Sequence, residues 1–207
     1  MTPAPTADWR TIPDILNAQA DARAKAPALF GTDGTFVNYE VLRNETQALA
    51  STLSALGPQE TRLRMGVVMP NGLDISVVLL AAARQSIAVP FNPARTAVEF
   101  EAQFTATTVD YVLVPADVQT PALGALRLCP FRLLSSQWIA RLKRRRPRTR
   151  HKNLQTRMIS ALILMTSGST TMPKIVPLSQ RNLCRSALDV AHSLALTPQD
   201  KCLVLRE

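Results

Sequence analysis

A hydroxyl-rich segment late in the sequence carries the residue types best suited to chemistry. Residues 166–174 read Thr-Ser-Gly-Ser-Thr-Thr-Met-Pro-Lys, between largely apolar runs at 162–165 and 175–178. This order predicts a strand, a loop and a second strand. Gly168 allows the backbone to come close to a ligand, and successive N–H groups in such a turn can form a nest that binds anions. The segment therefore suits a phosphate group.

The side chains of this segment are also suited to phosphate. Lys174 supplies a compact positive charge for polyphosphate. Short hydroxyl donors, which can also contact a hydrated Mg²⁺, come from Thr166, Ser167, Ser169 and Thr170. The pattern is not the Walker A motif, which ends in Gly-Lys-Ser/Thr. From the residues alone, a solvated Ser/Thr hairpin with a single Lys stays open as the other interpretation.

The segment resembles the phosphate-binding signature of the adenylate-forming enzymes, which include acyl-CoA synthetases, luciferases and the adenylation domains of peptide synthetases. The usual pattern is Thr-Ser-Gly-Ser/Thr-Thr-Gly-x-Pro-Lys-Gly. Residues 177–183, Pro-Leu-Ser-Gln-Arg-Asn-Leu, extend the match in the style of the acyl-CoA synthetases. Thr171 and Ile175 stand where the pattern has glycine. Because Ile175 is β-branched, we expect the second strand to be regular at that position.

The resemblance implies a ligase reaction. Such enzymes use MgATP to convert a carboxylate into an acyl-adenylate and pyrophosphate, and most then transfer the acyl group to a thiol, often that of CoA. We therefore expect ATP and Mg²⁺ as cofactors, with a small carboxylic acid and CoA or a carrier thiol as partners, and no nucleic acid. The residues implied to contact the ATP phosphates are Thr166, Ser167, Gly168, Ser169, Thr170, Thr171 and Lys174, with Mg²⁺ arriving on ATP near Thr170.

The family's other functional segments have no counterpart in residues 1–207. These segments are the adenine pocket, a Tyr-Gly-x-Thr-Glu stretch, a ribose-binding Asp and the adenylation Lys of a mobile C-terminal domain. The expectation is therefore the N-terminal part of such a ligase, without the C-terminal domain and not complete for catalysis as this chain, so the catalytic residues stay unknown. Two alternatives remain, a non-catalytic remnant and a basic module that binds nucleic acid through residues 141–152.

The middle of the chain predicts the scaffold for the loop. Strands and helices alternate there, which favours an α/β fold with a mainly parallel sheet covered by helices. The expected order is a strand at 63–69, an apolar helix at 73–84, a strand from 87, a helix at 96–107 and a strand at 110–114.

The flanking regions predict further elements. Before the first of these strands we expect a helix at 12–25, short strands at 28–30 and 35–37, and an amphipathic helix from 39 to 56 that ends at a Gly-Pro pair. After the loop we expect a helix from 179 to 196 with Ser179 as its N-cap, and then a strand from 201 to 205.

The same family resemblance extends beyond the loop. It includes Asn-Tyr-Glu-Val-Leu from residue 38, Gly-Val-Val-Met-Pro-Asn from 66 and Val-Pro-Phe-Asn-Pro from 89. Together these segments imply one partial N-terminal AMP-binding domain over 1–207. Its expected parts are a first α/β part at 11–117, an irregular basic insert at 118–157, and the loop hairpin with its following helix at 158–207.

The basic insert accounts for the charge of the chain. Residues 141–152 hold eight of the 24 Lys and Arg, so that without them the net charge of +9 would be about +1. No acidic residue occurs between Asp117 and Asp189. Three interpretations stay open: a disordered surface loop, a coding error or frameshift corrected before Ser160, and a contact with nucleic acid or an anionic membrane. Aromatic stacking on bases has little support, since only Trp138 lies near the run.

The remaining composition favours a cytoplasmic protein. The three cysteines lie far apart, so we predict no disulfide framework and no zinc site. Residues 1–9 do not have the pattern of a secretory signal, and the longest apolar run, 77–83, is too short to span a bilayer. For His151 and His192 we expect no catalytic or ligand role, because neither has a partner in view.

Overall fold

The computed structural model describes residues 9–57, 62–115, 121–122, 160–166 and 174–204. The basic run at 141–152 lies outside the described residues, as do His151 and all of the insert except residues 121–122. Five of the seven expected phosphate contacts also lie outside them: Ser167, Gly168, Ser169, Thr170 and Thr171.

Four of the five described helices begin at a side-chain cap, and α3 begins after Gly72 without one. Their bounds are Ile12–Arg23 for α1, Tyr39–Ser54 for α2, Leu73–Gln85 for α3, Ala97–Thr107 for α4 and Gln180–Ser193 for α7. The side chains of Thr11, Asn38, Thr96 and Ser179 each accept the backbone N–H three residues on, at the start of α1, α2, α4 and α7 respectively. This bond satisfies one of the free donors at a helix start. The predicted N-cap at Ser179 is confirmed.

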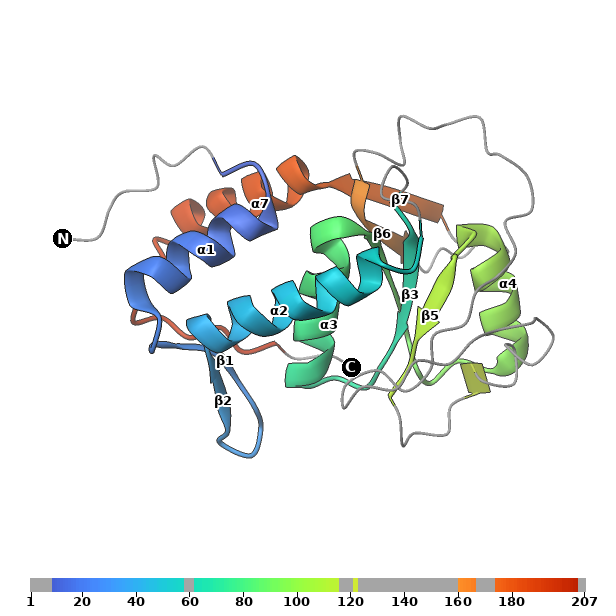
Figure 1. Ribbon diagram of the computed structural model, residues 1–207, viewed down its shortest axis with the longest axis horizontal. Helices are drawn as coiled ribbons and strands as arrows, with labels where there is room; N and C mark the ends of the chain where they lie inside the picture. The colour runs from blue at the N-terminus through green and yellow to red at the C-terminus, as the bar shows by residue number, and fades with distance from the viewer. Residues whose placement is uncertain (1–8, 58–61, 116–120, 123–159, 167–173, 205–207) are drawn as a thin grey trace.

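The strands form a small hairpin and one larger sheet (Figure 1). The hairpin pairs β1 (Pro27–Phe30) with β2 (Phe36–Asn38) in antiparallel fashion. The sheet has the order β5-β3-β4-β6-β7, with bounds Tyr111–Leu113, Arg64–Val68, Ile87–Phe91, Ser160–Thr166 and Lys174–Ser179 in that order. The pairs β5·β3, β3·β4 and β4·β6 are parallel, and β6·β7 is antiparallel. The predicted α/β fold with a mainly parallel sheet is confirmed.

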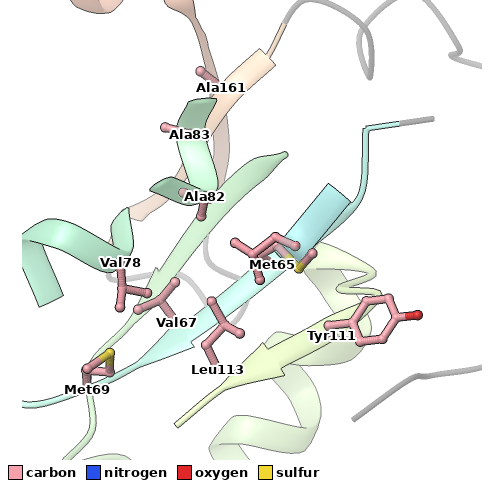
Figure 2. Packing of buried hydrophobic residues seen from close by; sticks show 11 residues of the cluster. Met65, Val67, Met69, Val78, Ala82, Ala83, Tyr111, Leu113 and Ala161 are labelled. Atoms are coloured by element: carbon pink, nitrogen blue, oxygen red, sulfur yellow. The ribbon is translucent and has the colours of Figure 1, made fainter. Parts of the chain in front are cut away.

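Helices cover both faces of this sheet. Figure 1 shows α4 on one side and α2 and α3 on the other. The α3 side packs side chains of α2 and α3 against alternate residues of the strands, and Figure 2 shows the members Met65, Val67, Met69, Val78, Ala82, Ala83, Tyr111, Leu113 and Ala161. On the α4 side, Phe100 and Phe104 pack against Phe91 and Ile163 among others. The apolar helix predicted at 73–84 is therefore a core helix, since α3 contributes to two of the buried clusters.

One predicted element is wrong. Residues 201–204 do not form a strand, and Leu203 and Val204 are 78% and 85% exposed. An apolar run forms a strand only when another strand accepts its backbone hydrogen bonds, and no described strand pairs with this segment. The other predicted elements are present with ends that differ by a few residues. Of the described helices, none is long and apolar enough to cross a membrane.

Candidate functional site

The carboxyl ends of the parallel strands lie at one edge of the sheet. Since β3, β4, β5 and β6 run in the same direction, their carboxyl ends lie together. The residues that follow these strands are 69–72, 92–95, 114–115 and the segment after Thr166. In open α/β sheets, ligands bind outside the carboxyl ends of the strands. The hydroxyl-rich segment therefore begins at the edge where this architecture binds ligands.

The β6–β7 hairpin brings the two ends of that segment together. Thr166, the last residue of β6, is the register partner of Lys174, the first residue of β7. Both residues are exposed. Within the described part of the chain, no carboxylate forms an ion pair with Lys174. The hairpin thus places the Thr166 hydroxyl and the Lys174 ammonium group on paired residues at the two ends of the loop.

The second strand is regular where the family pattern has glycine. Ile175 pairs with Met165, and the register shift between the described strands of the hairpin lies at the other end, between Ser160 and Leu162. The Ile175 side chain is 41% exposed, so its branched side chain is accommodated at the surface. The two strands expected on either side of the loop are confirmed, and residues 167–173 lie outside the described residues.

Two residues at the other end of the hairpin were missed by sequence reasoning. Arg62 donates hydrogen bonds to four backbone carbonyls, those of Ala83, Arg84, Gln85 and Ser160. Burial lowers the pKa of the Arg62 guanidinium. Gln180, the first residue of α7, is 9% exposed; it accepts the N–H of Ile12 at 3.0 Å and donates to the carbonyl of Ala83. Arg62 and Gln180 bind backbone atoms that are distant in the sequence. Such contacts do not depend on the type of the partner residue, so no sequence motif reveals them.

The remaining polar groups do not add to the loop site. A hollow along α7 is lined by Asn182, Arg185, Ser186, Asp189, Val190, Ser193 and Leu194, none of them a predicted site residue. His192 is exposed on the same helix. Among the described residues, no group of three or more His, Cys, Asp or Glu could hold a metal ion. The described chemistry of the site therefore rests on Thr166 and Lys174.

Comparison with known families identifies the class of protein. The family model described as AMP-binding enzyme matches residues 16–205. This chain belongs to the AMP-binding enzyme family. The match includes the hairpin, the loop and the parallel sheet, so the family resemblance seen in the sequence is confirmed.

Individual members of the AMP-binding family match in sequence over part of their length. The chain is 32% identical to an acyl-CoA synthetase of Gibberella moniliformis over 116 residues, which is 56% of this chain and 21% of that protein. It is 51% identical to the oxalate–CoA ligase of Saccharomyces cerevisiae over 45 residues, 22% of this chain and 8% of that protein. The matched region is thus about a fifth or less of these two relatives.

A solved structure of similar fold is the fatty acyl-adenylate ligase from L. pneumophila in complex with acyl adenylate and pyrophosphate. The TM-score is 0.67 at 21% identity, over 92% of this chain and 34% of that chain. At this identity the likeness establishes the fold alone. It confirms the AMP-binding family's α/β architecture for most of the chain.

Proposed function

We propose that this chain binds the phosphates of ATP through residues 166–174, as part of a ligase that activates a carboxylic acid. The observation that carries the proposal is the pairing of Thr166 with Lys174 at the carboxyl edge of the sheet. Membership of the AMP-binding family and the acyl-CoA synthetase and CoA ligase among its relatives support it.

The residues present fit a polyphosphate. Lys174 is an exposed cation without a carboxylate partner among the described residues, so its charge is available to an anion. Thr166 offers an exposed hydroxyl beside it. Ser167, Gly168, Ser169, Thr170 and Thr171 join these two and would add hydroxyl and backbone donors. Mg²⁺ would arrive with ATP, near Thr170, and would neutralise part of the phosphate charge.

In the proposed reaction the carboxylate oxygen of the acid attacks the α-phosphorus of ATP. The bond from this phosphorus to the bridging oxygen breaks, and pyrophosphate leaves with the negative charge. Donors fixed in place around the leaving phosphates lower the barrier, because they interact most strongly with the charge that develops. In the second proposed step a thiol, that of CoA or a carrier, attacks the acyl carbon and loses its proton to solvent, while AMP leaves. We assign no residue of this chain to binding the acid or the thiol.

Calorimetric titration with MgATP tests the proposal. A hydrogen bond to a charged group contributes about 1.5–3 kcal/mol, and about 1.4 kcal/mol corresponds to tenfold in affinity. Lys174→Ala should therefore weaken binding by about tenfold or more. The matched control is Lys201→Ala, which removes the same charge from a lysine that lies over the Phe30 ring. Equal affinities of the two variants would contradict a phosphate contact at Lys174.

A further inference from the structure

The two strands of the hairpin that carries residues 166–174 differ in how the core holds them, since β6 buries Ala161 and Ile163 whereas β7 buries no residue. β6 also forms a register pair with β4, Leu162 with Ala88. Ile175 of β7 is 41% exposed. Burial of one face is what normally fixes the register of a strand, because a slip by one residue exchanges its two faces. In β7 this source of register is weak.

Two polar contacts, made by Arg62 and Gln180, lie at the end of the hairpin opposite to the loop. Ser160 and Ser179, the first residue of β6 and the last of β7, are register partners there. The Ser160 carbonyl accepts a hydrogen bond from Arg62 at 3.2 Å. Gln180 follows Ser179 directly and is held by Ile12 and Ala83. Each strand of the hairpin is therefore fixed next to its outer end.

Both contacts lead to the last turn of α3. The final carbonyls of a helix have no partner within the helix. Arg62 donates a hydrogen bond to three of these carbonyls, with donor–acceptor distances of 3.4 Å to Ala83, 2.8 Å to Arg84 and 3.4 Å to Gln85. Gln180 also donates to Ala83. A positive charge at a helix C-terminus is favoured by the helix dipole, which strengthens the Arg62 contact. The helix end is thus a fixed point to which both strands are tied.

We infer that Arg62 and Gln180 are positioning residues for Thr166 and Lys174, the two ends of the proposed phosphate-binding segment. They hold the two strands of the β6–β7 hairpin at the end of α3, and the hairpin carries this placement to Thr166 and Lys174, roughly 20 Å away along the strands. A role in capping α3 alone would stabilise the chain without affecting the hairpin more than the rest. The inference rests on the proposed function, because Thr166 and Lys174 belong to the proposed ATP site.

Hydrogen exchange followed by mass spectrometry on the 207-residue chain separates these roles. Gln180→Met keeps the length of the side chain but removes both of its hydrogen bonds, and Arg62→Lys keeps the charge but removes the planar fork. The control is Leu42→Val, in a buried cluster that contains no residue of β6 or β7. We expect amides of residues 160–166 and 174–179 to exchange about tenfold faster in both variants, with α4 unchanged. Hairpin amides that exchange no faster, relative to α4, than in the control would overturn the inference.

Titration of the same variants with MgATP completes the test. Both Gln180→Met and Arg62→Lys should bind about fivefold or more weakly than the wild type, and Leu42→Val should bind equally. Unchanged affinity together with faster hairpin exchange would overturn the positioning of Thr166 and Lys174 for ATP. Failure of the wild type itself to bind MgATP would instead refute the proposed function, and the exchange data would still decide whether the two residues hold the hairpin.

Discussion

Replacing Gly66 with alanine tests how closely β3 packs against its neighbouring strands and the Phe91 ring in the parallel sheet. Gly66 lies in β3, between register partners in β4 and β5. A Cβ atom at this position would lie 3.0 Å from Cε2 of Phe91 and 3.4 Å from the backbone oxygen of Tyr111. The first distance is shorter than ordinary carbon–carbon contacts, whose optimum is about 3.5–4.0 Å. The Phe91 ring would therefore have to move.

The surroundings of Phe91 set the expected magnitude. Its ring is 3% exposed, and its centroid lies 4.9 Å from that of Phe104 and 6.4 Å from that of Phe100. Overpacking of this kind costs about 1–3 kcal/mol, whereas replacing Gly stabilises by about 0.4–1 kcal/mol through the unfolded chain. We expect Gly66→Ala to lower the free energy of unfolding by about 1.5 kcal/mol, which lowers the Tm of a domain of this size by about 3–6 °C.

Urea and thermal unfolding followed by circular dichroism measure this loss. The control is a double-mutant cycle with Phe91→Leu, which removes the ring that the new methyl group would contact. Phe91→Leu should cost less stability in the Gly66→Ala background than in the wild type. A Gly66→Ala variant as stable as the wild type, or equal costs of Phe91→Leu in both backgrounds, would refute the packing argument.

Two further predictions concern a helix start and the cysteines. The N–H and hydroxyl of Thr96 hold the pKa of Glu99 below its usual range, so this capping interaction stabilises the folded chain above the unfolded pKa of about 4.3 and is lost as pH falls through the lower folded pKa. Thr96→Ala should therefore reduce the dependence of the free energy of unfolding on pH in the acid range. Unfolding curves from pH 3 to 7 that the substitution leaves unchanged would contradict this prediction. Burial raises the pKa of the Cys184 thiol, the Asp14 charge raises it further, and Cys202 is exposed. Mass spectrometry after brief alkylation should therefore find Cys202 modified and Cys184 protected until urea is added. Equal labelling of the two cysteines would contradict this prediction.

Much of the scaffold could be predicted from the sequence, because a buried strand or helix needs apolar residues at regular intervals. The apolar residues of β3, β4 and α3 follow the patterns of buried strands and a buried helix, and Ser179 is recognisable as a cap from its type and place. The exception is the run at 201–204. Its composition suits a strand, but a strand also needs a neighbour, and composition carries no information about that.

The candidate site could be predicted only in part. Thr166 and Lys174 are found from the order of residues around the loop, and the sheet brings them together as that order requires. Gln180 and Arg62 could not be found in the same way. Gln180 bonds to a backbone group 168 residues earlier, and Arg62 to one 98 residues later, and backbone partners leave no mark in the types of side chain. Their role depends on where the fold places the end of α3.

The most direct test of ATP binding by residues 166–174 is a titration of the isotope-labelled chain with MgATP, followed by backbone amide NMR. We predict that amide signals of residues 166–174 shift together with increasing MgATP, that those of α4 stay in place, and that Lys174→Ala abolishes the shifts. Shifts confined to other parts of the chain, or shifts of residues 166–174 that survive Lys174→Ala unchanged, would contradict ATP binding at this segment.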